Sequence, residues 1–430
     1  MRTGACCFIP IVLLSGSILA AADWSGFRGP NGSGVAEGST FPVEWDATKN
    51  IAWRAEVPGK GHSQPVVSGN RVFLTVDIEG DPAPVGKEPK HRMDGADFHH
   101  VRALPPDHRH RLEVLCFDAD TGKRLWQRVA YEGTVFDSRD RKSNYATLTP
   151  VTDGERLIVS FESQGVYAYN FQGDLLWKAS FGGIKTAGIG AGTSPVLVGD
   201  HVLFQLDQDD GTDSFIAALN KKDGKVAWRT PRSSQVSWST PVVSSGQLIV
   251  SSTESTIGYD PKTGRELWKG PGVEGNAVPS PVAANGLVYV SSGVPKKRLY
   301  ALRNDGSVAW TYQKGTAYVV SPIVYGEFLY IFTDAGLMTC LDAKTGAVKY
   351  EGKRPPKPAN FTASPIAYDR KLLMTNEDGD TFVIAAGPEH AVVATNPIGE
   401  PVFASLAPSG DSVYIRGEKH LFRVRRPAAK

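Results

Sequence analysis

Five histidines stand close together in one stretch of the chain, and imidazole is a common metal ligand. They are His91, His99, His100, His108 and His110, with Asp94, Asp97 and Asp107 between and beside them. Imidazole and carboxylate ligands together suit Zn²⁺ or a similar ion. The spacing matches no standard metal motif, and the five prolines between residues 82 and 106 are equally typical of a surface lid. The sequence is therefore compatible with both a metal site and a surface lid.

Two further segments carry residue types that bind ions. Residues 207–213 read Asp-Gln-Asp-Asp-Gly-Thr-Asp, and carboxylates near a glycine turn suit Ca²⁺. The segment lacks the spacing and the terminal Glu of the twelve-residue calcium loop, so a solvated acidic turn is the simpler interpretation. Residues 182–192 hold five glycines, but no helical pattern follows them, which argues against a phosphate cradle and predicts a flexible loop.

The elements that position these residues follow from a repeated pattern. A Ser/Thr-Pro pair opens an apolar strand again and again, and from Pro150 onward the spacing is roughly 40 to 46 residues, as in four-stranded propeller blades. The pairs are Ser63-Gln64-Pro65, Thr149-Pro150, Ser194-Pro195, Thr240-Pro241, Ser280-Pro281, Ser321-Pro322 and Ser364-Pro365, with a degenerate eighth copy at Ser405-Leu406.

The end of each repeat is marked by a glycine followed four residues later by a tryptophan. The tryptophans are Trp126, Trp177, Trp228, Trp268 and Trp310, after Gly122, Gly173, Gly224, Gly264 and Gly306; Gly346 and Tyr350 keep the register. Glycine suits the left-handed position of a hairpin loop, and a large ring fills the wedge between neighbouring blades. We therefore expect these residues to be structural.

The pattern predicts an all-β fold, an eight-bladed propeller of four-stranded antiparallel blades. Trp53 lies ahead of the first Pro-led strand, while residues 421–424 form a third-type strand with no outer strand after it. We expect residues 51–57 to supply that outer strand and close the ring, which leaves no open sheet edge. The predicted domains are 23–50, an N-terminal extension, and 51–427, a single propeller with an insertion at 78–110 in its first blade.

In such a propeller, the loops that precede the first strands meet around the mouth of the central channel, where small ligands usually sit. Aromatic rings, amides and an imidazole at these positions suit a planar or sugar-like ligand; alternatively, they plug the channel and cap strand ends. The candidate residues are His62, Asn144, Tyr145, Trp238, Asn276, Tyr318 and Phe361.

The first residues read as a signal peptide, residues 1–22, with Arg2, an apolar run over 8–14 and Ala20-Ala21-Ala22 before the cleavage point. The protein is therefore expected in the periplasm or secreted. No later apolar run is long enough for a transmembrane span. The net charge of +2 favours neither nucleic acid nor an anionic membrane. Beyond the signal, Cys116 and Cys340 are expected to be buried free thiols.

The stretches 118–126 (Asp-Ala-Asp-Thr-Gly-Lys-Arg-Leu-Trp) and 260–268 (Asp-Pro-Lys-Thr-Gly-Arg-Glu-Leu-Trp) resemble the repeat of quinoprotein-type propellers, the PQQ-like repeat superfamily. This superfamily holds quinone-dependent dehydrogenases and non-catalytic scaffolds of the BamB type. The dehydrogenases hold the quinone against a Trp and a pair of adjacent cysteines, with Ca²⁺ on acidic and amide oxygens. Here the adjacent pair, Cys6-Cys7, falls in the predicted signal peptide.

We therefore interpret the chain as an exported, non-catalytic propeller that acts as a binding or scaffold protein through loops at the channel mouth. An envelope protein or a small molecule is the expected partner, and a monomer the expected state. One alternative is a PQQ-dependent or quinone-linked oxidoreductase. The other is a metal- or carbohydrate-binding propeller that uses Ca²⁺ or Zn²⁺, with the His-rich insertion as its cover.

Overall fold

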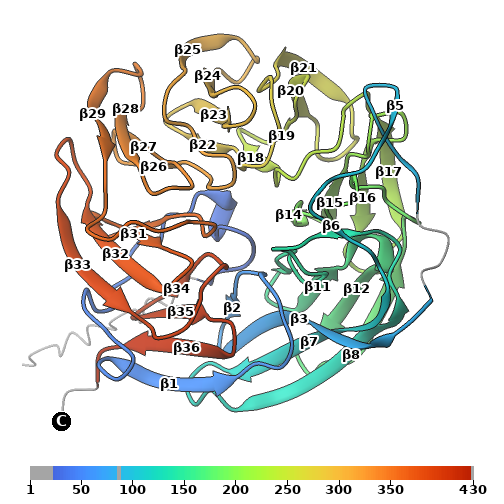
Figure 1. Cartoon of the computed structure of the whole chain (residues 1–430), viewed down its shortest axis with the longest axis horizontal. Coiled ribbons are helices and arrows are strands. Elements are labelled where there is room, and N and C mark those ends of the chain that lie inside the picture. The colour runs from blue at the N-terminus through green and yellow to red at the C-terminus, as the bar shows by residue number, and fades with distance from the viewer. Residues whose placement is uncertain (1–22, 85–88, 428–430) are drawn as a thin grey trace, which may run out of the picture.

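The computed structural model describes residues 23–84 and 89–427 and shows an eight-bladed β-propeller. Eight four-stranded antiparallel sheets stand around a central axis (Figure 1), which confirms the predicted fold class. The predicted signal peptide, 1–22, and residues 85–88 of the insertion lie outside the described residues. Two 3-10 turns are present in the described part, η1 (Pro30–Gly32) and η2 (Glu162–Gln164).

The blades are numbered 1 to 8 in chain order, and their strands are given from the centre outward. Blades 1 to 4 contain β2 (Val66–Ser68), β3 (Arg71–Pro82), β7 (His108–Asp118) and β8 (Arg124–Thr134); β10 (Val151–Thr152), β11 (Arg156–Ser160), β12 (Val166–Asn170) and β13 (Leu175–Ala179); β14 (Val196–Val198), β15 (His201–Leu206), β16 (Phe215–Asn220) and β17 (Val226–Pro231); and β18 (Val242–Ser244), β19 (Gln247–Ser251), β20 (Ser255–Tyr259) and β21 (Glu266–Pro271).

Blades 5 to 8 repeat the arrangement. They contain β22 (Val282–Ala284), β23 (Leu287–Ser292), β24 (Arg298–Leu302) and β25 (Val308–Tyr312); β26 (Ile323–Tyr325), β27 (Phe328–Phe332), β28 (Met338–Asp342) and β29 (Val348–Lys353); β30 (Ile366–Tyr368), β31 (Lys371–Thr375), β32 (Asp380–Ala385) and β33 (Val392–Pro397); and β34 (Ala407–Ser409), β35 (Ser412–Arg416), β36 (His420–Arg425) and β1 (Ile51–Glu56).

Blade 8 is completed by the start of the propeller domain, as the sequence predicts. Strand β1 pairs antiparallel with β36, and the register sets Arg54 opposite Phe422 and Glu56 opposite His420. The two strands lie side by side although one begins and the other ends the ring (Figure 1). Because this pairing joins distant parts of the chain, the ring has no open seam.

The repeated Gly and Trp contact each other across blades rather than within one blade. A β-carbon on Gly173 of blade 2 would lie 2.8 Å from the indole of Trp126 in blade 1, and a β-carbon on Gly224 would lie 2.5 Å from Trp177. The indole nitrogen of Trp126 donates to the carbonyl oxygen of Phe171 at 2.9 Å. Each tryptophan therefore packs against the next blade, and the glycine of that blade leaves space for the indole ring.

Within a blade, the second and third strands form the core. Every residue of β23 is buried, whereas the outer strand β1 alternates between partly buried and exposed residues. Blade 5 turns at Asn285-Gly286, and both residues have left-handed backbone conformations, with φ values of 54° and 76°. A two-residue hairpin turn of type I′ requires positive φ at both of its central residues. This agrees with the hairpin that the dipeptide predicts.

The N-terminal extension, residues 23–50, packs on the ring. Trp24, Phe41 and Trp45 are buried in the same apolar cluster as β1 and β36. Trp24 forms a bridge with Val67 of blade 1, and Val35 forms one with Ala367 of blade 7. The extension thus ties together the blades on both sides of the closure, and η1 lies near the centre of the ring (Figure 1).

Candidate functional site

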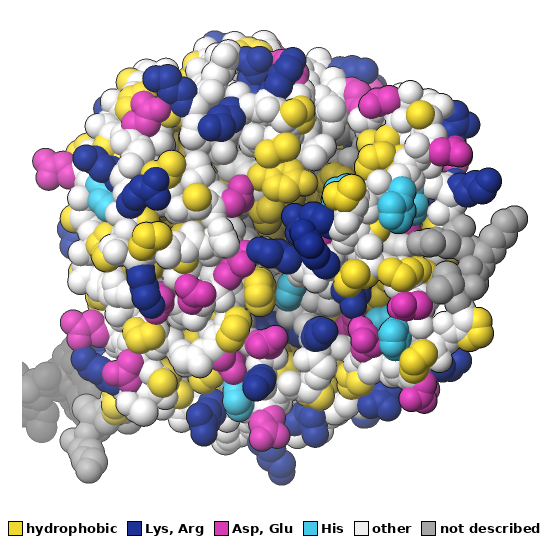
Figure 2. Space-filling view, in the orientation of Figure 1, with side chains coloured by type: hydrophobic (Ala, Val, Ile, Leu, Met, Phe, Trp, Pro, Cys, Tyr) yellow, Lys and Arg dark blue, Asp and Glu magenta, His cyan; other side chains and the backbone are white. Residues whose placement is uncertain are grey.

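A cavity of about 490 Å³ lies at the centre of the propeller, and we call it the hub cavity. The eight loops that precede the innermost strands, here the inner loops, all contribute residues to its wall. In Figure 2, apolar side chains gather beside a group of Lys and Arg side chains at the centre of this face. Of the seven mouth residues proposed from the sequence, four line the hub cavity, namely His62, Trp238, Tyr318 and Phe361.

The floor of the hub cavity is a ring of hydrogen bonds between blades. In each bond, the backbone N–H before a repeat proline donates to the hydroxyl at the same position of the next blade, at 2.9 to 3.1 Å. The bonds run from Gln64 to Thr149, Thr149 to Ser194, Ser194 to Thr240, Thr240 to Ser280, Ser280 to Ser321, Ser321 to Ser364 and Ser364 to Ser405.

This hydroxyl ring, formed by the seven Ser and Thr side chains, explains why Ser or Thr precedes the proline. The sequence shows the recurrence but assigns no task to the hydroxyl. Blade 1 departs from the rule with Gln64, whose amide nitrogen donates to the carbonyl oxygen of Leu406 at 2.5 Å and so completes the circle. The irregular Ser-Gln-Pro copy is therefore the link between the last blade and the first.

The N-terminal extension closes the channel beneath this floor. Phe27 lines the hub cavity, and the next residue, Arg28, is 1% exposed. The Arg28 backbone N–H donates to Oε1 of Gln64 at 2.7 Å, and its Nη2 donates to the carbonyl oxygen of Pro322 at 2.8 Å. Burial lowers the pKa of Arg28 to about 9, which leaves the guanidinium charged at neutral pH.

Trp238 projects from the inner loop of blade 4 and is held by the glycine-rich loop. Its indole nitrogen donates to the carbonyl oxygen of Gly190 at 2.8 Å. A β-carbon on Gly192 would lie 2.6 Å from the β-carbon of Trp238, so this position needs glycine. The sequence predicts a flexible loop here, whereas Gly190 and Gly192 of this loop contact Trp238 directly.

His62 forms a second ring surface in the hub cavity. It stacks on Phe403, with ring centroids 4.8 Å apart and planes 25° apart. Burial and the charges of Arg416 and Arg139 lower the pKa of His62 to about 3, so the imidazole is neutral at physiological pH. Together the two rings present an uncharged aromatic surface.

Charged groups at the rim of the hub cavity are paired with one another. Nη2 of Arg102 lies 2.8 Å from Oδ1 of Asp140, and Nζ of Lys142 lies 3.1 Å from Oε2 of Glu377. The carboxylate of Asp334 accepts the backbone N–H groups of residues 318, 319 and 320 at 2.8, 2.8 and 3.4 Å. The rim thus offers donors and acceptors side by side.

The insertion in blade 1 builds one wall of the hub cavity. Its ladder prolongs β3 and β7, so residues 78–82 and 108–110 are paired strand. Beyond it, β4 (His91–Met93) and β5 (Ala96–Phe98) form a hairpin beside blade 3 (Figure 1), and β6 (Ala103–Leu104) pairs with β9 (Arg139–Asp140). Between these elements, His100 and Arg102 reach the cavity wall.

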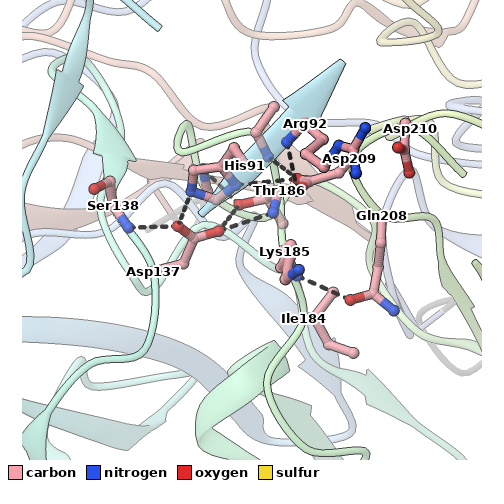
Figure 3. Close-up of polar contacts among 12 residues, drawn as sticks. His91, Arg92, Asp137, Ser138, Ile184, Lys185, Thr186, Gln208, Asp209 and Asp210 are labelled. Atoms are coloured by element: carbon pink, nitrogen blue, oxygen red, sulfur yellow. Dashed lines mark hydrogen bonds and ion pairs between the residues drawn. The ribbon is translucent and has the colours of Figure 1, made fainter. Parts of the chain in front are cut away.

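His91 pins this insertion to the ring. Its Nε2 lies 2.9 Å from Oδ1 of Asp137 and its Nδ1 lies 3.0 Å from Oδ1 of Asp209, and all three side chains are buried (Figure 3). Burial opposes the charged imidazole, but the hydrogen bonds and charges of the two carboxylates outweigh it and raise the pKa of His91 to about 9. Both carboxylates also accept backbone N–H groups, from Thr186 and Ala187.

Three of the seven mouth residues proposed from the sequence do not line the hub cavity. Asn144 is buried and its Oδ1 accepts the backbone N–H of Ala146, while the hydroxyl of Tyr145 donates to the carbonyl oxygen of Asp137. Asn276 contacts Tyr318, with its Nδ2 3.5 Å from the Tyr318 hydroxyl. Asn144 and Tyr145 therefore bond to the backbone of loop residues rather than line the cavity.

The five histidines of the insertion are not brought together. His91 and His110 are buried against different carboxylates, and His110 Nδ1 lies 2.7 Å from Oδ1 of Asp77. His99 is exposed, and His108 pairs with its neighbour Asp107. Within residues 23–84 and 89–427, no group of three or more His, Cys, Asp or Glu side chains is arranged to hold a metal ion. Metal binding here stays a prediction.

The acidic stretch 207–213 is not the solvated turn that we expect from its sequence. Asp207 and Asp209 are 3% and 5% exposed. Asp209 holds His91, and Oδ1 of Asp207 lies 3.3 Å from Nε of the buried Arg232. The prediction was wrong for these two residues because their cationic partners lie far away in the sequence.

The two cysteines in the described residues are free and buried, as predicted. Cys116 lies in β7 and Cys340 in β28, and burial raises the pKa of both thiols to about 12. Neither borders the hub cavity. Within the described part of the chain, no helix has the length and apolar character needed to cross a membrane.

Comparison with known proteins gives matches in sequence and in structure. The family model of the outer membrane protein assembly factor BamB matches residues 110–233 and 212–427. BamB of Yersinia pestis is 22% identical over 321 residues, which cover 63% of this chain and 79% of that protein.

Solved structures of known proteins share the fold. BamB from Moraxella catarrhalis superposes with a TM-score of 0.54 at 11% identity, over 82% of this chain and 99% of that chain. The quinohemoprotein alcohol dehydrogenase from Comamonas testosteroni superposes with a TM-score of 0.64 at 10% identity, over 95% of this chain and 82% of that chain.

Proposed function

This chain belongs to the BamB family of PQQ-like propellers, and on that premise we propose that it is an exported, non-catalytic binding or scaffold protein. The observation that carries the proposal is the convergence of all eight inner loops on one walled cavity. Loops on a rigid ring are well suited to recognition, because the scaffold fixes their positions. At the rim, Arg102 is paired with Asp140 and Lys142 with Glu377, which favours binding over acid–base chemistry.

We expect the partner to be a protein of the cell envelope that contacts the mouth-side loops. The related proteins are named as outer membrane protein assembly factors, and this supports an envelope partner for this chain. The predicted signal peptide supports a periplasmic or secreted location. A second copy is not needed to complete the hub cavity, so we propose a monomer.

The proposal is tested by cross-linking and capture from the native envelope fraction. Bait proteins are the wild type, a mouth variant carrying Trp238→Ala with Tyr318→Ala, and a perimeter control, Val226→Ser, whose side chain is 60% exposed on an outer strand. A partner retained by the wild type and the control but lost by the mouth variant supports the proposal. Equal capture by all three, or loss only with the perimeter variant, contradicts it.

The second candidate function is a quinone-linked oxidoreductase, which the fold shared with the quinohemoprotein alcohol dehydrogenase favours. Trp238 offers a ring face for a quinone, but Cys116 and Cys340 lie in separate blades, away from the hub cavity. The carboxylates of Asp140 and Glu377 are paired with cations. The described residues therefore do not fit PQQ with its calcium ion.

A direct assay separates the two functions. The purified protein is loaded with PQQ and Ca²⁺, and dye reduction is followed with alcohols and sugars as substrates. We expect no reduction above the level of PQQ and Ca²⁺ alone. Turnover that depends on the protein and disappears with Trp238→Ala would establish the oxidoreductase instead.

A further inference from the structure

We infer that the hub cavity binds a neutral saccharide, with a sugar ring lying on Trp238 and its hydroxyl groups bonded to the paired residues of the rim. The inference rests on the proposed function, since it takes the channel mouth to be the binding surface. It adds the chemical class of the ligand, which follows from four properties of the wall.

The first property is uncharged aromatic surface. The indole nitrogen of Trp238 is bonded to Gly190, so the ring that lines the cavity has no free polar atom. His62 is neutral and stacked on Phe403, and Tyr318 lines the wall contributed by blade 6. Flat apolar rings suit the C–H faces of a sugar ring, which needs no charge on its partner.

The second property is the placement of donors beside acceptors. In the pair of Lys142 and Glu377, the carboxylate also accepts the hydroxyl of Thr362 at 2.6 Å. In the pair of Arg102 and Asp140, the guanidinium and the carboxylate lie 2.8 Å apart, and Oδ1 of Asp140 also accepts the backbone N–H of Lys142 at 2.8 Å, so the two pairs are neighbours on the rim. A sugar hydroxyl both donates and accepts, so neighbouring hydroxyls fit such a pair better than a purely anionic or cationic group does.

The third property is that the ionised groups already have partners. Among the described residues that line the hub cavity, the ionised side chains are two cations, Arg102 and Lys142, and three carboxylates, Asp140, Asp334 and Glu377, which leaves an excess of one negative charge. Both cations have a carboxylate partner, and the Asp334 carboxylate is surrounded by backbone N–H groups. An anionic ligand would have to break one of these pairs and would meet the excess negative charge, whereas a neutral polyol would do neither.

The fourth property is the floor. Six of the seven hydroxyls of the hydroxyl ring line the hub cavity. Each accepts one N–H of the previous blade, which uses a lone pair and leaves its O–H proton for a further bond. The floor therefore presents donors to the oxygen atoms of a bound ring, either directly or through water.

The test is isothermal titration calorimetry of the full chain with maltose, cellobiose and lactose as neutral probes, and with glucuronate and PQQ as anionic ones. We expect heat with at least one neutral disaccharide, and affinity at least about tenfold weaker in Trp238→Ala, from loss of the stacking surface. Glu377→Gln, which keeps an acceptor but removes the ion pair, should weaken the same probe. Lys222→Met, an exposed change on the perimeter, should not.

Circular dichroism and the melting temperature of each variant confirm folding before titration. The inference is overturned if no neutral probe binds at about 10 mM, if only glucuronate or PQQ binds, or if Trp238→Ala leaves saccharide affinity unchanged. These results leave the proposed function standing as long as envelope capture still depends on the mouth. Failure of both experiments would remove the two together.

Discussion

The indole of Trp53 lies against Gly122, where a β-carbon would approach the ring to 2.6 Å, and its nitrogen donates to the carbonyl oxygen of Ala119 at 2.9 Å. Trp53 belongs to the strand that completes blade 8, and Gly122 to the outer turn of blade 1. The contact repeats the Trp–Gly contact found at the five junctions from blade 1 to blade 6, at the place where blade 8 meets blade 1. This junction therefore depends on the same packing as those five.

Trp53→Ala should lower the free energy of unfolding by about 3 kcal/mol, because it removes the packing of the indole ring against blade 1 and leaves a cavity at that junction. Chemical denaturation followed by circular dichroism measures the change. Arg54→Ala, on the exposed side of the same strand, is the control and should stay close to the wild type. A Trp53→Ala protein as stable as that control would contradict the role of the closure, as would a stable protein lacking residues 51–57.

Gly192→Ala should weaken binding at the hub cavity more than it weakens the fold, because the added methyl group displaces Trp238. Gly192 has no left-handed backbone conformation, so the substitution acts through contact alone. Gly80→Ala is a matched control, since a β-carbon there meets no atom closer than 3.4 Å. Saccharide titration and partner capture give the readout. Unchanged binding in Gly192→Ala would show that the position of Trp238 is not important.

Ser321→Ala should cost about 1–3 kcal/mol of stability, because the buried N–H of Ser280 loses its acceptor in the hydroxyl ring. Ser321→Thr restores the hydroxyl, and threonine already occupies the ring at Thr149 and Thr240. Denaturant unfolding of the two variants is the measurement. If alanine and threonine were equally tolerated, the ring would not contribute to stability.

His91 should make stability depend on pH in the alkaline range. The folded-state pKa is raised from 6.5 to about 9, so its contribution is complete below pH 6.5 and is lost as pH rises through about 9. A shift of this size corresponds to about 3 kcal/mol. The groups that face the imidazole are the carboxylates of Asp137 and Asp209, with Arg92 beside Asp209.

The measurement is the difference in melting temperature between the wild type and His91→Gln, taken from pH 6 to pH 10. We expect the difference to be largest near pH 6, to shrink as the pH rises from 6.5 to 9, and to be small above pH 9. Val226→Ser, an exposed change on an outer strand that removes no titratable group, should show no such trend. A constant difference across the range would mean that protonated His91 does not stabilise the fold through its two carboxylate partners.

Removal of divalent ions with EDTA should leave the melting temperature unchanged, because the buried carboxylates of the described residues are held by cations and N–H groups of the protein itself. Differential scanning calorimetry before and after dialysis, then after adding Zn²⁺ or Ca²⁺, gives the result. A rise in melting temperature on adding Zn²⁺, abolished by His108→Gln with His99→Gln, would instead establish the predicted metal site at the insertion.

Much of the candidate site was predictable because it stands on repeated positions. His62, Trp238, Tyr318 and Phe361 precede inner strands, and the repeat length alone places such residues around the channel. Asn144 and Asn276 occupy similar positions in the sequence but face elsewhere, because loop residues follow no periodicity that fixes the direction of a side chain. The role of Gly192 could not be predicted from the sequence either, because glycine is needed there only to leave space for the side chain of Trp238 in the next blade.

The sequence by itself determined the number of blades, the closing strand and the tryptophans that pack between blades, because each is encoded in residues a fixed distance apart. Only the tertiary structure decided the charge pairs, for example His91 with Asp209 and Lys142 with Glu377, whose members are 118 and 235 residues apart. A closed ring brings such loops together at its centre in an order that no local pattern records. The character of the hub cavity, lined with paired donors and acceptors, is therefore a property of the assembled ring.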